Sequence, residues 1–479
     1  MSTPPIPPRL VVGFDLDMTL IDTVSGFADV LRVLGAELGA DLPIDQLTTK
    51  LGPPLAHLLE PHLPEDQIAP AVERFRVLYP DHAIASVPAL PGAAEALAAV
   101  RRHGGRVLVV TGKFTANARL HLDHLGFEID LLEGEVWGAG KGEILRREGA
   151  SIYVGDHVHD VEGALAAGAL SVSVLTGGCT REELEAAGTQ VVLESLADFP
   201  SWLDDHLLHT RLAALEADLR RRGSVLVAYS GGADSAFLLA AAVRALGADN
   251  VVAATGYSHS LPMSERDPAA RFAADLGVRL LTPRTHELDR DGYRVNGPDR
   301  CFFCKAELLD TLAPLAAEHG MAYVATGTNA DDAVAGFRPG IRAAHERGAI
   351  APLRDAGLTK AQVREASRRW SLPTWDKPAA ACLSSRVAYG VEITPARLAR
   401  VERAEEAARM VLDALGVRNL RVRDRGDRAS IEVDADLLPL GADVEERLLQ
   451  AVVVAGFPAA TVDPRGFRSG SMNDVLRRA

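Results

Sequence analysis

The stretch that most constrains this chain is VLVAYSGGADSAFLLAAA, residues 225–242. An apolar, β-prone run meets a glycine-rich turn, and a helix-like run opens directly after it. Glycines let the backbone turn tightly and approach a bound anion. The N-terminus of a helix presents unpaired N–H groups and the positive end of the helix dipole, so a phosphate is well placed there. The residues concerned are Ser230, Gly231 and Gly232 in the turn and Asp234 and Ser235 at the helix start.

No Gly-Lys-Ser or Gly-Lys-Thr follows, so this turn is not a Walker A loop. It resembles the SGGxDS loop of the ATP pyrophosphatases, which split ATP into AMP and pyrophosphate. The resemblance implies that Ser230, Gly232 and Ser235 hold the pyrophosphate, that Gly231 belongs to the same nucleotide-binding turn, and that Asp234 helps to place Mg²⁺. The alternative is an ordinary strand–turn–helix corner, but two glycines between two serines form a demanding pattern.

Length and charge limit the kind of protein. A chain of 479 residues predicts two to four domains. The formal net charge of −14 argues against a broad nucleic-acid-binding face. No apolar run is long enough to span a bilayer, and prolines interrupt the N-terminus where a signal peptide would be apolar. Four cysteines do not suggest a disulfide framework. We therefore expect a cytoplasmic protein whose thiols are available for chemistry.

The first part of the chain carries polar residues at the ends of expected strands. The run 10–20 ends in Asp15 and Asp17, which share one side of an extended segment. Two carboxylates at a strand end suit a Mg²⁺ ion and a nucleophile. Thr111 and Asp156 end two further strands, at 106–110 and 151–154, and the alternation with helices predicts a doubly wound parallel sheet. Lys141 and Asp160 complete the set.

These residues resemble the four motifs of the haloacid dehalogenase superfamily, most closely its phosphoglycolate-phosphatase-like branch, over residues 10–200. The resemblance implies that Asp15 is the nucleophile that takes the phosphoryl group and that Asp17 is the general acid/base. It implies that Thr111 and Lys141 bind the phosphoryl oxygens. Mg²⁺ would be held by Asp15, Asp156 and the backbone carbonyl of Asp17, with Asp160 in support. The alternative is a degenerate fold kept for its structure.

One position departs from this family pattern, because Met18 stands where the family has glycine after the second aspartate. We expect a slightly narrower loop and no lost functional group. Residues 22–88 show apolar spacing of three and four, which predicts helices. In the resemblance they form a cap that selects the leaving group of a phosphate ester. A proline and then amphipathic spacing across 197–223 place a domain border near residue 205.

The second part of the chain carries seven motifs in a fixed order. They are SGGADS, GPDRCFFCK, GTNADD, GFRPG, LPTWDKPAAACLSSR, RVRDRGDRASIEV and GFRSGSMN. A phosphate-binding turn alone is shared with many enzymes, but the whole set resembles the LarE family over residues 207–479. These proteins are ATP-dependent pyridinium-carboxylate sulfur transferases, which serve the biosynthesis of the nickel-pincer nucleotide cofactor. The resemblance implies adenylation of a pyridinium dicarboxylate mononucleotide and then formation of a thiocarboxylate.

The sulfur source stays open at the level of sequence. In one form of the family the cysteine at the position of Cys382 gives up its own sulfur and becomes dehydroalanine. In another form three cysteines hold a [4Fe–4S] cluster, whose open iron carries an extra sulfide. Cys301, Cys304 and Cys382 supply three thiols and leave one iron open. A structural zinc would need a fourth ligand. Cys382 has a role in both leading interpretations.

Further candidates follow later strands. Gly327 ends a strand, and Asp331 and Asp332 after it are candidates for binding Mg²⁺ or AMP. Arg421 and Arg423 lie two apart on an expected strand, so they share a face. A facing arginine pair suits a substrate phosphate, and the alternative is a solvated charged strand. Trp375 suits either stacking on a pyridinium ring or a place in the core.

We therefore predict an α/β protein with two doubly wound parallel-sheet domains and a small α+β C-terminal region. The domains are 1–205, 206–390 and 391–479. The cofactors are ATP and Mg²⁺, with a [4Fe–4S] cluster on the three thiols as the first of the open alternatives. The substrates are a pyridinium nucleotide and a phosphate ester, and the resemblance weakly favours a homo-oligomer. The rival functions are tRNA thiolation, which the acidic balance disfavours, an amide-forming synthetase, which would need an ammonia source, and a non-catalytic first domain.

Overall fold

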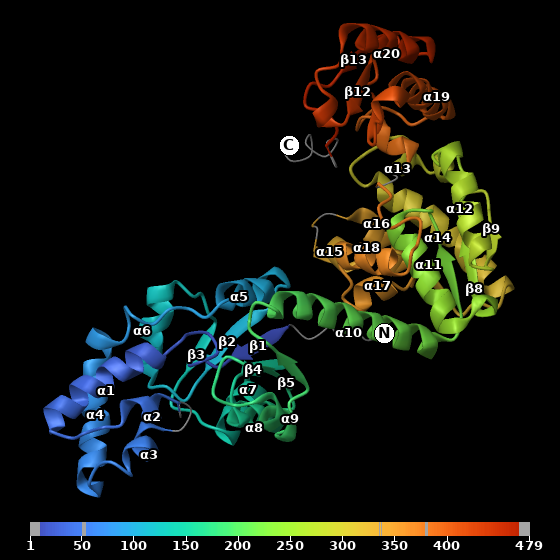
Figure 1. The fold of residues 1–479 in the computed structure, drawn as a ribbon. Coiled ribbons are helices and arrows are strands. Elements are labelled where there is room, and N and C mark those ends of the chain that lie inside the picture. The colour runs from blue at the N-terminus through green and yellow to red at the C-terminus, as the bar shows by residue number, and fades with distance from the viewer. Residues whose placement is uncertain (1–9, 50–53, 335, 337, 379–381, 469–479) are drawn as a thin grey trace. The chain divides into compact units, whose positions relative to one another are not determined.

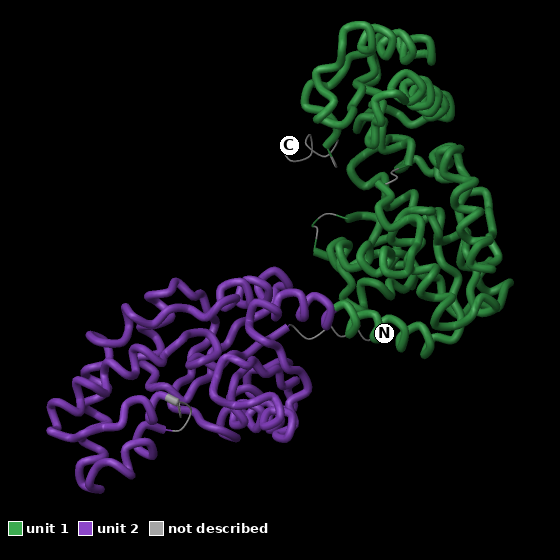
Figure 2. Tube along the Cα trace, viewed as in Figure 1, with its two compact units in different colours: residues 1–7, 208–479 green, residues 8–207 purple. Residues whose placement is uncertain are grey.

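The structure is a computed structural model, and it describes residues 10–49, 54–334, 336, 338–378 and 382–468. The chain divides into two compact units, which we call the N-terminal unit, residues 8–207, and the C-terminal unit, residues 208–479 (Figure 2). Each unit has its own parallel sheet and its own buried core.

A six-stranded parallel sheet forms the centre of the N-terminal unit, in the order β3-β2-β1-β4-β5-β6. The chain moves outward from β1 to β3 and resumes on the other side of β1 with β4, so the strand order reverses between β1 and β4. Open α/β sheets bind ligands at the carboxyl ends of their strands, next to such a reversal. The strands are β1 (Val11–Phe14), β2 (Arg106–Val110), β3 (Leu131–Glu133), β4 (Ile152–Gly155), β5 (Leu170–Val174) and β6 (Val191–Leu193).

Two groups of helices accompany this sheet (Figure 1). One group alternates with the strands: α5 (Ala93–Arg102), α6 (Thr115–Leu125), α7 (Ala139–Arg147), α8 (Val158–Ala167) and α9 (Arg181–Ala186). The other group is the helical insert after β1: α1 (Val24–Leu38), α2 (Ile44–Thr49), α3 (Leu55–Leu59) and α4 (Glu65–His82). The insert has a buried core of its own, which includes Leu31, Leu34 and Phe75. We call these four helices the cap.

The sheet of the C-terminal unit has four parallel strands in the order β10-β7-β8-β9. The strands are β7 (Val225–Ala228), β8 (Val251–Ala254), β9 (Arg279–Leu281) and β10 (Tyr323–Thr326). The order reverses between β7 and β10, so a ligand is expected where these two strands end. The main helices are α11 (Ala233–Leu246), α12 (Met263–Asp275), α14 (Arg300–Glu318) and α18 (Lys360–Arg369), with the short α13 (Asp291–Arg294), α15 (Ala330–Val334), α16 (Pro339–Glu346) and α17 (Pro352–Asp355).

A small α+β region follows in the same unit. Strands β11 (Leu420–Asp424) and β12 (Ala429–Val433) pair antiparallel, and β13 (Ala460–Val462) joins β12 in parallel. Helices α19 (Pro395–Leu412) and α20 (Ala442–Val454) contribute to its core. That core also takes in Tyr293 and Leu383, which precede residue 391, where the sequence predicted the start of the last domain.

The predicted fold class is confirmed: two doubly wound parallel sheets and a small α+β region. The border between the units, at residues 207 and 208, lies within α10 (Phe199–Arg222). No helix in the described ranges is both long and apolar enough to cross a membrane.

Candidate functional site

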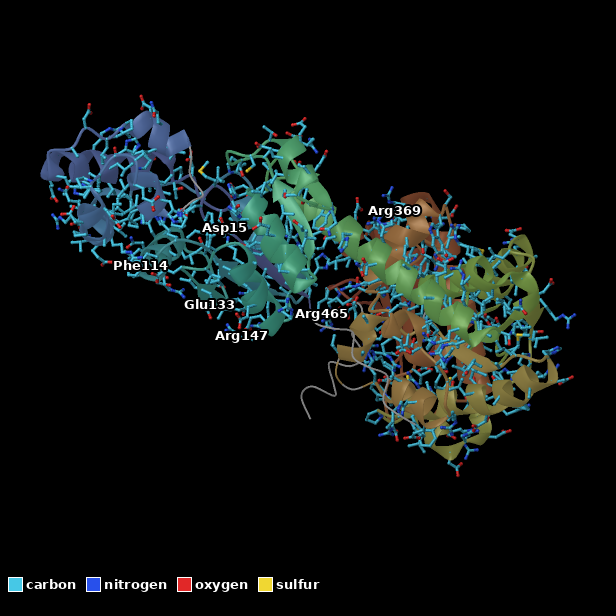
Figure 3. All side chains as sticks on the ribbon, turned by 90° about the horizontal axis from the view of Figure 1, so that it is seen from below. Asp15, Phe114, Glu133, Arg147, Arg369 and Arg465 are labelled. Carbon is cyan, nitrogen blue, oxygen red and sulfur yellow. The ribbon has the colours of Figure 1, made fainter. Side chains whose placement is uncertain are left out.

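The predicted residues of the N-terminal unit meet where three neighbouring strands end. Asp15 follows β1, Thr111 follows β2 and Asp156 follows β4. Parallel register between these strands puts their carboxyl ends at one edge of the sheet. All three side chains are buried. Asp15 is labelled in Figure 3.

Lys141 enters this site from α7 and is the cation at its centre. Its Nζ donates to Asp15 Oδ1 at 2.9 Å and to Asp160 Oδ1 at 2.6 Å. It also donates to the hydroxyl of Tyr153, at 3.0 Å. The two ion pairs outweigh burial, which opposes the charge, and the pKa of Lys141 is raised well above its usual value. The lysine therefore stays charged, as a group that neutralises phosphoryl oxygens must.

Three carboxylates converge beside Lys141. The part of the chain that the structure describes holds one set of three metal-ligating side chains (His, Cys, Asp or Glu) whose ligand atoms all lie within 4.8 Å of one another. This set is Asp15, Asp156 and Asp160. Burial raises the pKa of Asp15 to about 7, with Lys141 opposing the shift. Burial likewise raises the pKa of Asp156, although Thr19 donates to its Oδ1 at 2.7 Å. Crowded, buried carboxylate oxygens fit a hard divalent cation such as Mg²⁺.

Asp17 has a partner that sequence reasoning did not assign. Lys113 Nζ donates to Asp17 Oδ1 at 2.7 Å. The two residues are 96 positions apart, and the only signal was that Lys113 follows the end of a predicted strand. Met18, next to Asp17, has φ +59°. This left-handed conformation suits glycine and strains other residues. It therefore explains why the family has glycine at this position, and Met18 adopts the same conformation at the cost of strain.

A cavity of about 280 Å³ lies above these groups, between the sheet and the cap. Its floor includes all six predicted residues: Asp15, Asp17, Thr111, Lys141, Asp156 and Asp160. Its roof comes from cap helices, with Phe27, Leu58 and Phe75 among the lining residues. Phe114, labelled in Figure 3, lines it as well. The structure thus brings the predicted site residues of this unit together in one enclosed space.

The C-terminal unit places its glycine-rich turn between β7 and α11. Gly231 has φ +72°, and Gly232 is the residue before the helix. Ser235 Oγ accepts a hydrogen bond from Ser230 N at 3.2 Å. Asp234, in the first turn of α11, accepts from Asn329 Nδ2 at 3.1 Å. The turn has the conformation that an anion-binding loop requires.

The end of β10 lies directly against this turn. A Cβ on Gly327 would be 2.9 Å from Ser235 N, so only glycine lets the two loops approach this closely. Asp332 lines the neighbouring cavity, whereas Asp331 does not. Instead, Asp331 Oδ2 accepts from Lys360 N, at 2.8 Å, at the start of α18. The nucleotide-binding role of Asp331 stays a prediction.

One cavity of about 390 Å³ joins the turn to two of the three thiols. Ser230, Gly232, Asp234, Ser235 and Gly327 line one part of it, and Cys304 and Cys382 line another. Glu287, which sequence reasoning missed, also lines it and is 3% exposed. Its carboxylate accepts from the hydroxyls of Ser258 and Ser260. A nucleotide phosphate and a cysteine sulfur can therefore meet in the same space.

The three thiols share one electrostatic environment on α14 and the turn before Leu383. Burial and the nearby Cys382 raise the pKa of Cys304 well above its usual value. Cys301 is exposed and does not line the cavity. Arg300 places Nη2 4.0 Å from Cys301 Sγ, and its guanidinium interacts with Cys382. Two of the three candidate thiols, Cys304 and Cys382, thus meet at the cavity, and an iron–sulfur cluster on all three stays a prediction.

The arginines of β11 lie next to the loop that carries Cys382. Arg423 Nη1 donates to Ser385 O at 3.2 Å, and its guanidinium also pairs with Glu432 at 2.7 Å. Burial lowers the pKa of Arg421 to about 10, with nearby arginines contributing. Arg421 and Arg423 are 9% and 5% exposed, so the alternative of a solvated strand is wrong. Their role toward a substrate phosphate stays a prediction.

Trp375 is 42% exposed, so the core alternative for this residue is wrong. It does not line the cavity of the C-terminal unit.

Comparison with known proteins agrees with the two units. The family model for haloacid dehalogenase-like hydrolases matches residues 12–165. An uncharacterised Synechocystis protein is 40% identical over 274 residues, covering 57% of this chain and 100% of its own length. The pyridinium-3,5-bisthiocarboxylic acid mononucleotide synthase of Lactiplantibacillus plantarum is 35% identical over 272 residues, covering 57% of this chain and 97% of its own length. This chain is a LarE-family protein fused to a haloacid dehalogenase-like domain.

The N-terminal unit of this LarE fusion is also similar to a protein that is named as a kinase and not as a hydrolase. Tyrosine-protein kinase PtkA of Mycobacterium tuberculosis is 30% identical over 205 residues, covering 40% of this chain and 70% of its own length. The name describes transfer of a phosphoryl group by that protein.

Proposed function

We propose that the C-terminal unit is an ATP-dependent sulfur transferase that converts a carboxylate of a pyridinium carboxylate mononucleotide into a thiocarboxylate, for nickel-pincer nucleotide biosynthesis in the cytoplasm. The observation that carries this proposal is the single cavity shared by the phosphate-binding turn and Cys382. A site for adenylation alone would not need a thiol within reach of the activated carbonyl.

The first step makes a poor electrophile reactive. The substrate carboxylate attacks the α-phosphorus of ATP, and pyrophosphate leaves against the turn at Ser230, Gly232 and Ser235. The acyl-adenylate then carries AMP as a good leaving group. Asp234 would help to hold Mg²⁺, which would supply charge neutralisation for the phosphates. The buried arginines Arg421 and Arg423 hold the phosphate of the mononucleotide through their forked donors.

The second step has two candidate sulfur sources. In the first, Cys382 Sγ displaces AMP, and loss of the Cα proton with cleavage of the Cβ–S bond leaves dehydroalanine and a thiocarboxylate. In the second, Cys301, Cys304 and Cys382 would hold a [4Fe–4S] cluster, which would supply a sulfide for transfer. The place of Cys382 at the cavity supports the first source, and the cluster is the alternative.

Intact mass, measured anaerobically before and after incubation with ATP, Mg²⁺ and the pyridinium dicarboxylate mononucleotide, separates these routes. Loss of one H₂S at Cys382 supports the sacrificial route. AMP release and thiolated product with no mass loss support the cluster. Neither AMP nor product would contradict the proposed substrate.

We propose that the N-terminal unit is a Mg²⁺-dependent phosphatase. Asp15 attacks phosphorus, Lys141 and Thr111 hold the phosphoryl oxygens, and Asp17 gives a proton to the leaving group and then takes one from water. Asp15 and Asp156 would hold Mg²⁺, which offsets the repulsion between carboxylate and phosphate. The support is the ion pair of Lys141 with Asp15 inside the cluster of carboxylates.

Acetyl phosphate tests this second proposal, because its leaving group makes few demands on the cap. We expect Mg²⁺-dependent hydrolysis that is lost in Asp15→Asn. A phosphoaspartate can also pass its phosphoryl group to a tyrosine hydroxyl, as the name of PtkA suggests for that relative. Phosphotyrosine formed from ATP, with no release of phosphate from acetyl phosphate, would favour that acceptor over water.

A further inference from the structure

We propose that the phosphatase site takes phosphate monoesters of an apolar, ring-bearing alcohol, and that Thr23 makes a hydrogen bond to that alcohol. This inference rests on the phosphatase function proposed above and names its substrate class. It excludes small carboxylated esters such as phosphoglycolate.

The cavity has two chemically different halves. The floor carries the carboxylates and lysines that handle a phosphoryl group, and the roof carries apolar side chains from three cap helices. Phe27 comes from α1, Leu58 from α3, and Val72 and Phe75 from α4. Since the floor binds the phosphoryl group, the leaving group must occupy the roof. Burying an apolar group there is favourable, because it removes apolar surface from water.

The roof is rich in aromatic rings. Phe27 and Phe75 have centroids 5.2 Å apart, and Phe75 and Tyr79 follow at 5.6 Å. All three line the cavity, as do Phe114 and Trp137. Aromatic pairs favour edge-to-face and offset contacts at such distances. A flat ring in the leaving group therefore finds partners that a short polar chain does not.

The cations of the cavity already have partners. Among the described residues that line it, every lysine and arginine pairs with a carboxylate. Lys141 and Lys113 pair with the aspartates of the floor, where the phosphoryl group binds. Arg76 pairs with Glu73 at 2.9 Å and with Glu135 at 3.1 Å, and its guanidinium lies 4.5 Å from the Phe114 ring. A carboxylate in the leaving group would therefore have to compete with Glu73 and Glu135 for Arg76, and its lost hydration would be only partly compensated.

Thr23 provides an independent indication of a ligand. It is 2% exposed and lines the cavity. Its Oγ1 is buried with no hydrogen-bond partner in the described structure, and it makes no capping bond to α1 even though it precedes that helix. An unsatisfied buried hydroxyl is destabilising. A side-chain rotation that turns Oγ1 toward the cavity would let a hydroxyl or carbonyl on the bound alcohol satisfy it.

Two phosphate esters with comparable alkoxide leaving groups test the substrate class. We expect kcat/KM for benzyl phosphate to exceed that for phosphoglycolate at least about tenfold. Phe75→Ala should raise KM for benzyl phosphate by about tenfold. Val77→Ala is the matched control, because Val77 lies on the same helix and is 63% exposed.

Benzyl phosphates that carry a hydroxyl test Thr23. We expect at least one of the 3-hydroxybenzyl, 3-(hydroxymethyl)benzyl and 4-(hydroxymethyl)benzyl phosphates to have a lower KM than benzyl phosphate. That gain should disappear in Thr23→Val and persist in Thr23→Ser. No gain for any of these esters, or an equal gain in Thr23→Val, would overturn the role of Thr23.

Failure of the substrate class can be told apart from failure of the phosphatase function. If acetyl phosphate is hydrolysed but phosphoglycolate is preferred over benzyl phosphate, the function stands and this inference is wrong. If nothing is hydrolysed, the function fails. Calorimetry of the full chain with Mg²⁺ and either benzylphosphonate or phosphonoacetate then still decides: tighter binding of benzylphosphonate supports the apolar roof, and equal or reversed affinities overturn it.

Discussion

At the scale of single residues, the predicted site is largely assembled, but its supporting partners come from distant positions. The strand-end positions of Asp15, Asp17, Thr111 and Asp156, together with the family resemblance that adds Lys141, predict that these residues belong to one site. They do not predict Lys113 beside Asp17, because that pair depends on how two strands align in the sheet. Residue-scale predictions therefore concern these partners.

Lys113→Met should lower phosphatase kcat about tenfold. Burial disfavours the charge on Lys113, but the ion pair with Asp17 outweighs it, so the pKa of Lys113 is raised. Loss of this cation leaves the Asp17 carboxylate without its hydrogen-bonded partner, so the proposed general acid/base is no longer held in place. Lys113→Arg should restore most of the rate, because it can keep the ion pair. An unchanged kcat in Lys113→Met would contradict a role of the pair in the reaction.

His121 should make the N-terminal unit sensitive to acid. Burial, and then the nearby Lys113, lower the pKa of His121 from 6.5 to about 4. The unfolded chain thus binds a proton more readily, so the contribution of neutral His121 is complete above pH 6.5 and is lost as the pH falls toward 4. The loss amounts to about 3 kcal/mol in the free energy of unfolding.

Hydrogen exchange of β1 amides in the full chain measures this difference between wild type and His121→Gln. The wild type should lose stability more steeply than the variant as the pH falls from 6.5 to about 4. Parallel pH dependences would mean that the histidine is protonated as readily in the folded protein as in the unfolded chain. Tyr79 hydrogen-bonds to His121 Nε2 at 3.0 Å in the wild type, so the substitution itself changes stability at every pH. The comparison therefore concerns how steeply stability falls with pH, and not its absolute value.

At the scale of elements, the strand–turn–helix at 225–242 was predictable because its sequence is local: a β-prone run, glycines and a helix start. The approach of the β10 end to that turn was not, since it joins Gly327 to Ser235, far apart in the chain. The roles of Asp331 and Asp332 show the same limit. The sequence treats them alike, yet the direction in which α15 leaves the strand puts Asp332 at the cavity and Asp331 at the start of α18.

Gly327→Ala should therefore reduce ATP-dependent AMP release at least about tenfold. A Cβ at 2.9 Å from Ser235 N and 3.0 Å from its Cα meets backbone, which cannot move aside like a side chain. The phosphate-binding turn must shift instead. Gly441→Ala is the control, because a Cβ there meets nothing within 4 Å and its φ is −63°. Equal AMP release by both variants would contradict the close approach.

At the scale of the whole molecule, the two active sites should respond to mutation independently. Each unit has its own core and its own cavity, and changes at distant sites without shared partners are close to additive. Asp15→Asn should abolish hydrolysis of acetyl phosphate and leave AMP release unchanged. Cys382→Ala should abolish thiocarboxylate formation and leave hydrolysis of acetyl phosphate unchanged. Loss of both activities in either variant would indicate coupling between the units.

The helix α10 limits how this molecule can be dissected. Phe199, Leu203 and Leu207 belong to the core of the N-terminal unit, and Leu208, Leu215 and Leu219 to that of the C-terminal unit. A cut between residues 207 and 208 would leave each product its own core side chains, but it would create a new chain end inside α10, where the intact helix satisfies its backbone N–H and C=O groups. A cut at another place between Phe199 and Leu219 would strip core side chains from one of the two products.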